Sequence, residues 1–196
     1  MKPYSESCVQ NRDPILSVIE PLFRDRKDVL EIGSGTGQHA VYFAARMPHL
    51  TWHTSDLAEN HAGIRAWLDE AALPNTTGPV SLDVRHTPWS VPEADAVFSA
   101  NTTHIMHRDS VVALFEGVGK LLRSEGLFCL YGPFNYGGEY TSESNARFDE
   151  WLHERDPLSG IRDFDDLDRL AREAGLLLRD DYPMPVNNRI LCWCKS

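Results

Sequence analysis

The chain has 196 residues, of which 42% are hydrophobic and 24% are charged. These fractions lie near the averages for globular domains, so they exclude a disordered or fibrous chain and favour a single domain over residues 1–196. Acidic residues outnumber basic residues by 29 to 19, which gives a net charge of −10. Nucleic acid and anionic membrane surfaces are bound through clustered Lys and Arg, and the sequence has no such cluster, so neither partner is expected.

The sequence also indicates a cytoplasmic protein without a metal site. It contains no run of about 18 apolar residues that could span a membrane, and its start lacks the apolar core of a secretory signal. The four cysteines form no C-x-x-C pair and no zinc pattern, and the eight histidines are scattered. The oligomeric state cannot be inferred from these features.

Short apolar runs alternate with helical spacings along most of the chain. In chain order, the patterns predict a helix over 14–23, a strand over 27–33, a helix over 38–47, a strand over 50–55, a helix over 58–72, strands over 79–84 and 94–100, a helix over 109–122 and a strand over 126–134. Asp109 is the expected N-cap of the last helix. Such alternation is typical of a parallel sheet with helices on both faces.

The C-terminal part follows a different pattern. A short helix over 145–155 and an amphipathic helix over 163–174 are followed by two strands, 176–182 and 188–195, with a short link between them. Strands joined so closely must pair antiparallel. We therefore expect an α/β fold with a doubly wound, seven-stranded, mostly parallel sheet that ends in an antiparallel hairpin.

Two segments fall outside this alternation, residues 3–23 before the first strand and residues 135–160 after the fifth. Open α/β sheets bind ligands in the crevice at the carboxyl ends of their strands. We expect both segments to lie near that edge and to cover the active-site cleft.

A glycine-rich loop is the strongest chemical signal. The stretch VLEIGSGTG over residues 29–37 is a strand with the acidic Glu31 near its end, glycines at alternate positions, and then a helix. Glycine permits positive φ and lets a ligand approach the backbone. A dinucleotide fingerprint would need a third glycine at position 38, where this chain has Gln38. The E-x-G-x-G-x-G pattern instead resembles motif I of class I S-adenosylmethionine-dependent methyltransferases; the alternative is an ordinary glycine-rich turn.

Two further acids follow the next two predicted strands. Asp56 stands 19 residues after Gly37, and a carboxylate there can accept hydrogen bonds from both ribose hydroxyls. The resemblance implies that Asp83 meets the adenine amino group. Either acid alone would be an ordinary strand-end or turn residue, but both in register with the glycine loop favour a cofactor site.

Several longer segments resemble one poorly characterised methyltransferase family, which includes the protein called methyltransferase-like 26. The segments are EIGSGTGQHA (31–40), NTTHI (101–105), YGPF (131–134), ESNARFDEWL (143–152), GIRDFDDLDRLAREAGL (160–176) and MPVNN (184–188). The resemblance implies a class I methyltransferase fold that binds S-adenosyl-L-methionine and has no settled substrate. The cofactor contacts expected on these grounds are Glu31, Gly33, Ser34, Gly35, Thr36, Gly37, Gln38, His39, Asp56, Leu57, Asp83, Val84 and Asn101.

Polar residues near the same edge are candidates for the acceptor side. His104 follows the predicted strand 94–100, and its ordinary pKa suits a general base or an acceptor-orienting group. The alternative, that His104 only hydrogen-bonds within a loop, is equally open. Asn11, Asn135 and Tyr136 are expected to position the acceptor.

The expected function is methyl transfer from S-adenosylmethionine to a small-molecule acceptor by in-line displacement. One alternative is a non-catalytic S-adenosylmethionine-binding scaffold that acts through a partner protein. A weaker alternative is an NAD-dependent oxidoreductase, which the absence of a glycine at position 38 disfavours.

Overall fold

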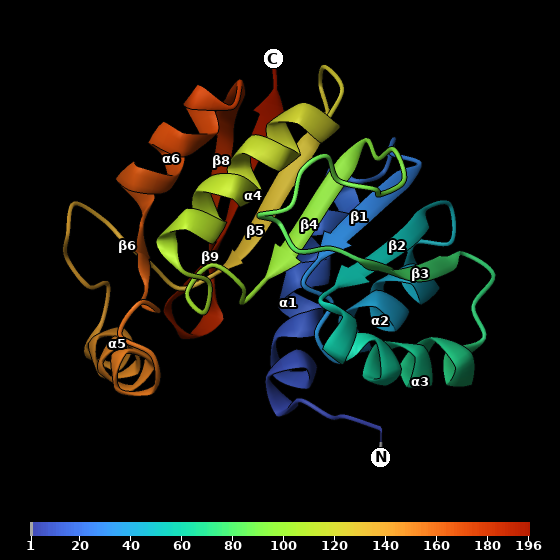
Figure 1. Cartoon of the computed structure of the whole chain (residues 1–196), viewed down its shortest axis with the longest axis horizontal. Helices are drawn as coiled ribbons and strands as arrows, with labels where there is room; N and C mark the ends of the chain where they lie inside the picture. Colours follow the sequence, from blue (N-terminus) through green and yellow to red (C-terminus); the bar gives the residue numbers. More distant parts are fainter. Residues whose placement is uncertain (1) are drawn as a thin grey trace.

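The computed structural model describes residues 2–196. Its main sheet has seven strands in the order β3-β2-β1-β4-β5-β9-β8 (Figure 1). The first five strands in this order, β3, β2, β1, β4 and β5, are parallel. Strand β9 runs antiparallel to both β5 and β8. The expected doubly wound sheet with a closing antiparallel hairpin is therefore confirmed. The strands are β1 (Asp28–Ile32), β2 (Thr51–Asp56), β3 (Thr76–Ser81), β4 (Ala96–Ala100), β5 (Leu127–Gly132), β8 (Leu176–Met184) and β9 (Asn188–Lys195).

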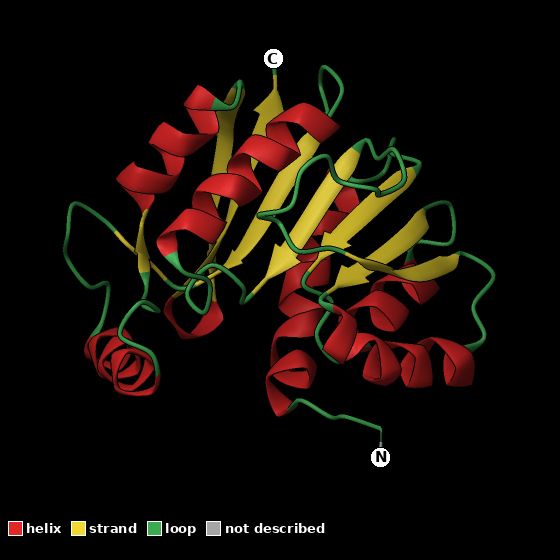
Figure 2. Ribbon diagram, in the orientation of Figure 1, coloured by secondary structure: helices red, strands yellow, loops and turns green. Residues whose placement is uncertain are grey.

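Residues 2–196 form six helices in addition to the sheet, and Figure 2 shows helices on both faces of the sheet. They are α1 (Glu6–Leu22), α2 (Gln38–Arg46), α3 (His61–Ala71), α4 (Arg108–Leu121), α5 (Glu143–Arg155) and α6 (Phe164–Glu173), with short 3-10 turns η1 (Ala58–Asn60) and η2 (Pro185–Asn187). A separate two-stranded sheet pairs β6 (Phe134–Asn135) with β7 (Arg162–Asp163). Among residues 2–196, no helix has both the length and the apolar character that a membrane crossing requires.

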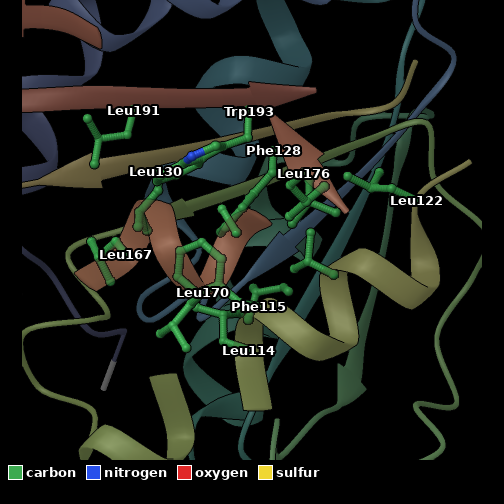
Figure 3. Packing of buried hydrophobic residues seen from close by; sticks show 14 of the residues in the cluster. Leu114, Phe115, Leu122, Phe128, Leu130, Leu167, Leu170, Leu176, Leu191 and Trp193 are labelled. Atoms are coloured by element: carbon green, nitrogen blue, oxygen red, sulfur yellow. The ribbon is translucent and has the colours of Figure 1, made fainter. Parts of the chain in front are cut away.

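Side-chain alternation along the strands divides the core into two layers. On β5, Phe128 packs with α4 and α6, whereas its neighbour Cys129 packs with α1 and α2. On β9, Trp193 packs on the face of α4 and α6, and Cys192 packs on the face of α1 and α2. Figure 3 shows the first layer, in which Phe115 of α4 meets the rings of Phe128 and Trp193 edge to face. Both faces of the sheet are thus buried, as a mostly parallel sheet requires.

The strand order opens a crevice at the carboxyl ends of β1 and β4. From β1 the chain moves outward through β2 to β3, then returns to place β4 on the other side of β1. The loops that leave β1 and β4 therefore turn toward opposite faces of the sheet. A crevice at such a switch point is where open α/β sheets bind ligands.

The third strand along the chain has different bounds from those expected. The strand expected at 79–84 is β3 at Thr76–Ser81, because pairing with β2 already begins at Thr76, opposite Trp52. Leu82 and Val84 are buried as loop residues, which accounts for the apolar run that suggested a longer strand. Asp83 consequently lies beyond the end of the strand.

The helix ends also differ from expectation. The first helix begins at Glu6, well before the expected start at residue 14, and Pro14 lies inside it. Asn11, Ile15 and Ile19 are its buried residues, and their spacing of four places them along one face. Asp109 is not an N-cap: the N-cap of α4 is His107, whose side chain makes no capping bond.

The buried carboxyl group of Glu31 fixes the loop after β1 through a hydrogen bond to Ser34. Its Oε2 atom accepts hydrogen bonds from Ser34 Oγ at 2.8 Å and from Trp52 Nε1 at 3.2 Å. Burial raises the pKa of Glu31 to about 7 despite these two bonds, because desolvation disfavours the carboxylate. Glu31 therefore ties the loop to β2 from inside the protein.

The aromatic cluster on the α4 face leads to a first prediction. Replacing Phe115 with Ala removes a fully buried ring and leaves a cavity beside the stacked rings of Phe128 and Trp193, so the free energy of unfolding should fall by about 3–5 kcal/mol. Urea unfolding would measure the change. The matched control is Leu177→Ala on β8, because Leu177 is 55% exposed and its loss should change stability by less than about 1 kcal/mol. Equal losses in the two variants would contradict the packing described here.

A second prediction concerns the proton on Glu31. The folded protein holds this proton more tightly than the unfolded chain, whose pKa lies near 4.5. The resulting stability is fully present below pH 4.5 and is lost as the pH rises through about 7. Glu31→Gln resembles the protonated carboxyl group and should remove that loss.

Between about pH 4.5 and pH 8, the wild-type protein should lose on the order of 3 kcal/mol more stability than the Gln variant. Urea unfolding of both proteins across this range is the measurement. Parallel pH profiles for the two would show that Glu31 ionises normally in the folded state.

Candidate functional site

Two adjoining cavities open at the carboxyl edge of the sheet, on either side of the glycine loop. Their volumes are about 480 Å³ and about 530 Å³, and they are called here the first cavity and the second cavity. Both are lined by Gly33, Gly35, Ala100 and Asn101. The loops after β1 and β4 thus lie at the junction of the two cavities.

The glycine spacing of the loop has a separate reason at each position. All three glycines have positive φ, 74° at Gly33, 57° at Gly35 and 88° at Gly37. A Cβ atom at Gly33 would lie 2.6 Å from Thr102 Cγ2, and one at Gly37 would crowd the Ile64 backbone at 3.1 Å. At Gly35, by contrast, a Cβ atom would meet nothing within 4 Å. Gly35 is therefore the glycine over which a ligand can approach the backbone.

The first cavity contains the carboxylate of Asp56, at the end of β2. Asp56 Oδ2 accepts a hydrogen bond from the Gly35 backbone N–H at 2.7 Å. Its Oδ1 accepts from the Leu57 N–H at 2.7 Å and from Asn60 Nδ2 at 2.8 Å. The same carboxylate thus lines the cavity and fixes the loop that forms its edge. The other walls are Ile32, Leu82, Asp83, Val84, Arg85, Thr102, Ile105, Met106, His107 and Ser110.

Asp83 lines the first cavity as a firmly ionised carboxylate. Arg85 donates to it from Nε at 3.1 Å and from Nη2 at 2.8 Å, and its backbone N–H donates at 3.1 Å. The side-chain bond from Arg85 is the main reason that the pKa of Asp83 falls to about 2. Asp83 therefore offers acceptor oxygens to the cavity at neutral pH.

The second cavity lies under α1, α5 and η2. In its wall, His39 Nε2 and Asn11 Oδ1 are 2.7 Å apart, and the His39 ring stacks on Phe43. Burial, with a smaller contribution from the charge of Arg12, lowers the pKa of His39 to about 4. A neutral imidazole with its proton on Nε2 can donate to Asn11 Oδ1. Both expected residues thus reach this cavity as a hydrogen-bonded pair.

His104 lines the second cavity from the loop after β4. Its ring is buried and meets Phe148 of α5 edge to face at 5.3 Å. Gly160 N–H donates to the His104 carbonyl at 2.8 Å, and the Arg162 guanidinium donates to the carbonyls of Thr103 and Met106. Burial first, and the charge of Arg162 second, lower the pKa of His104 to about 4. The imidazole is therefore neutral at physiological pH.

Most of the residues expected from sequence to bind a cofactor reach one of the cavities. Leu57, Asp56, Asp83 and Val84 line the first, and Ser34, Thr36 and His39 line the second. Three others support the loop and are not in either lining: Glu31, Gly37 and Gln38. Gln38 clamps the start of α1, since its Oε1 accepts from Ser5 N–H at 2.6 Å and its Nε2 donates to the Ser5 carbonyl at 3.3 Å.

Asn135 and Tyr136, expected on the acceptor side, line neither cavity. Tyr136 stacks on Phe164, and its hydroxyl donates to Asp181 Oδ2 at 2.7 Å. Asn135 pairs with Asp163 in the small β6–β7 sheet. After Pro133 the chain pairs with β7 and lines neither cavity, so an acceptor role for these two positions stays a prediction.

Sequence reasoning did not single out several residues that line the second cavity. They include Cys8 on α1, Asn145 and Phe148 on α5, and Val186 on η2. Asn145 Nδ2 donates to the Asn187 carbonyl at 3.2 Å, which connects α5 to η2. Val186 has φ of 58°, a left-handed conformation that is strained for a β-branched residue. The amphipathic helix over 145–155 was the available signal for the α5 residues.

Solved structures with the same fold are methyltransferases. The chain superposes with a TM-score of 0.81 on the apo form of the S-adenosylmethionine-dependent methyltransferase SibL, with 20% sequence identity. It superposes at 0.83 on the mitomycin 7-O-methyltransferase MmcR and at 0.81 on human N-acetylserotonin methyltransferase in complex with S-adenosylmethionine, with 14% identity to each. These likenesses establish a class I, Rossmann-like methyltransferase fold.

The matches cover nearly all of this chain but only about half of the others. They span 96%, 97% and 97% of this chain, against 55%, 54% and 53% of SibL, MmcR and the human enzyme. Residues 2–195, almost the whole chain, match the model of one protein family. The chain therefore belongs to the family described as "Protein of unknown function (DUF938)".

Proposed function

We propose that this protein transfers a methyl group from S-adenosylmethionine to a small-molecule acceptor by in-line displacement. The observation that carries the proposal is the open space over Gly35, at the junction of two cavities and beside the Asp56 carboxylate. An elongated molecule that crosses this junction would keep one end in each cavity. The resemblance to the family that includes methyltransferase-like 26 and the fold of SibL support the same assignment.

The first cavity suits the adenosine part of the cofactor. Asp56 and Asn60 offer polar groups for ribose hydroxyls, and the ionised Asp83 can accept from the adenine amino group. The apolar side chains of Leu82 and Val84 give a flat base a surface to pack on. When bound, S-adenosylmethionine supplies a methyl group that its sulfonium already activates.

The work of the protein would then be alignment and exclusion of water. Holding two reactants in line can lower the barrier by about 7–11 kcal/mol in favourable systems. Asn101 lines both cavities, so it lies at the junction between them, where the reacting atoms would meet. His104, neutral and buried in the second cavity, can accept a proton or a hydrogen bond from an acceptor hydroxyl or amine.

The cofactor assignment is tested by binding. The wild-type protein should bind S-adenosylmethionine in calorimetry, and Asp56→Asn should weaken that binding at least about tenfold, because an amide offers one acceptor oxygen instead of two. The control is Asp69→Asn, at an exposed position of α3, which should bind like the wild type. Unchanged affinity in the Asp56 variant, or binding of NAD in place of S-adenosylmethionine, would overturn the assignment.

The role of His104 is tested by turnover. His104→Ala should lower kcat by roughly 100-fold and leave the affinity for S-adenosylmethionine unchanged, because removal of a positioned base costs about that much. Formation of S-adenosylhomocysteine across a panel of small acceptors is the measurement, with the exposed His49→Ala as control.

The pH profile gives an independent readout for His104. Because the pKa of this imidazole is lowered to about 4, the rate should not decline between pH 7 and pH 5 and should fall only as the pH drops through about 4. A decline near pH 6.5, or normal turnover in His104→Ala, would exclude the role. Binding of S-adenosylmethionine without turnover on any acceptor would favour a non-catalytic scaffold.

A further inference from the structure

The wall of the second cavity offers no opposite charge to the amino-carboxylate end of the cofactor. With adenosine in the first cavity, that end would cross Gly35 and lie between the glycine loop, α1 and the start of α2, all of which line the second cavity. The lining of this cavity, all of it within residues 2–196, contains no Asp, Glu, Lys or Arg. A carboxylate that enters therefore depends on a positive charge from just behind the wall.

Two guanidinium groups bring positive charge to this wall. Burial first, and a guanidinium charge second, lower the pKa of both histidines in the wall, with Arg12 acting on His39 and Arg162 acting on His104. Arg162 already donates to three backbone carbonyls. Its donors hold the surrounding loops together, so Arg12 is the group that can serve a ligand.

Arg12 is not satisfied by the protein itself. Its Nε atom is buried and has no hydrogen-bond partner among residues 2–196. Its Cζ atom lies over the Tyr42 ring, 4.4 Å from the ring centroid, and the neighbouring Asp13 accepts from the Tyr42 hydroxyl. No ion pair within residues 2–196 includes Arg12. A buried donor without an acceptor is costly, and a ligand carboxylate would remove that cost.

The position of Arg12 on α1 directs its side chain toward the cavity. Cys8, which lines the cavity, lies four residues earlier and therefore on the same face of the helix. Long side chains of a helix lean toward its N-terminus, so Arg12 extends over the turn that contains Cys8. On α2, Tyr42 follows the wall residue His39 by three positions. The guanidinium over Tyr42 is therefore about one helical turn from the cavity wall.

Polar contacts fix this part of α1 beside the start of α2. Gln38 Oε1 accepts from the Ser5 N–H at 2.6 Å, and His39 Nε2 lies 2.7 Å from Asn11 Oδ1. Backbone N–H groups at the N-terminus of a helix such as α2 also favour an anion. Arg12 and the start of α2 thus present positive charge to the same end of the cavity.

We propose that Arg12 binds the carboxylate of S-adenosylmethionine, so that α1 forms part of the cofactor site as well as covering it. This assignment rests on the proposed function, because it takes S-adenosylmethionine as the ligand. Arginine binds carboxylates through two parallel N–H donors, and such charge-assisted bonds are stronger than neutral ones. A pair through Nε and one Nη atom would give Nε the partner that it lacks.

Two ligands that differ only in the carboxylate test this assignment. They are S-adenosylmethionine and its decarboxylated form, which keeps the adenosine, the sulfonium and the amine. In calorimetry, the wild type should bind S-adenosylmethionine at least about tenfold more tightly than the decarboxylated form. Arg12→Gln should weaken S-adenosylmethionine binding at least about tenfold and change binding of the decarboxylated form by less than about twofold. If Arg12→Gln weakens both ligands alike, or neither, the proposal is wrong.

The matched control is Arg46→Gln. Arg46 also lies over the Tyr42 ring, with its Cζ atom 3.5 Å from the centroid, but its charge is not among the causes that shift the pKa of His39. This variant should bind both ligands like the wild type, and Arg12→Lys, which keeps the charge, should recover part of the affinity lost in Arg12→Gln. Equal losses in Arg46→Gln and Arg12→Gln would assign the effect to packing on Tyr42 and overturn the proposal.

The imidazole of His39 gives a readout that needs no cofactor. Arg12→Gln removes the positive charge beside this ring, so the pKa of His39 should rise from about 4, whereas Arg46→Gln should leave it unchanged. An NMR titration of the histidine rings is the measurement. An unchanged pKa in Arg12→Gln would show that the charge does not reach the cavity wall, and the proposal would fail.

The outcomes separate this proposal from the proposed function. If S-adenosylmethionine binds equally well to the wild type and to Arg12→Gln, the role of Arg12 fails and methyl transfer stands. If binding depends on Arg12 but no acceptor is methylated, methyl transfer fails and the role of Arg12 stands. If the wild type binds neither form of the cofactor, both fail.

Discussion

Hydrogen bonds attach the glycine loop after β1 to β2, and the shape of both cavities depends on this attachment. The loop turns through three residues with positive φ, so its N–H groups cannot be satisfied by regular secondary structure. Gly33 and Ser34 N–H both donate to the Ser55 carbonyl at 3.0 Å, and Gly35 N–H donates to Asp56. Glu31 also fixes the loop, because its carboxyl group accepts a hydrogen bond from Ser34 Oγ. Because the loop separates the two cavities, these few bonds determine the shape of both.

The attachment also limits what Asp56 can do for a ligand. A carboxylate has about four acceptor positions, and Asp56 already accepts three hydrogen bonds, from Gly35, Leu57 and Asn60. One position is left for a ribose hydroxyl. A contact with both hydroxyls requires a second position, and the Asn60 side-chain amide is the partner that can move away without a change in the backbone. Asn60 therefore belongs with Asp56 in any account of cofactor affinity.

The sequence predicted the parts of the molecule that depend on local pattern. The glycine loop, Asp56 and the hairpin of β8 and β9 follow from residue type and spacing over short stretches. Asn135 lines neither cavity because β6 pairs with β7, and this pairing joins residues 28 positions apart. The neutral state of His104 depends on its burial, to which Phe148 contributes, and on Arg162, both on later segments of the chain. No local pattern could reveal such contacts, because packing between distant elements produces them.

The net charge of −10 and the uncharged second cavity act at different ranges. Surface charge disfavours the approach of anions over about a Debye length, roughly 8 Å at physiological salt, and it attracts cations over the same distance. The overall charge alone would thus select cationic ligands. Inside the cavity a cation meets neutral amides, hydroxyls and imidazoles, which cannot replace its hydration as a carboxylate would. The cavity wall thus opposes the cations that the surface charge attracts. An anion that reaches the wall lies near the positive charges of Arg12 and Arg162, which add to burial in lowering the pKa of His39 and of His104.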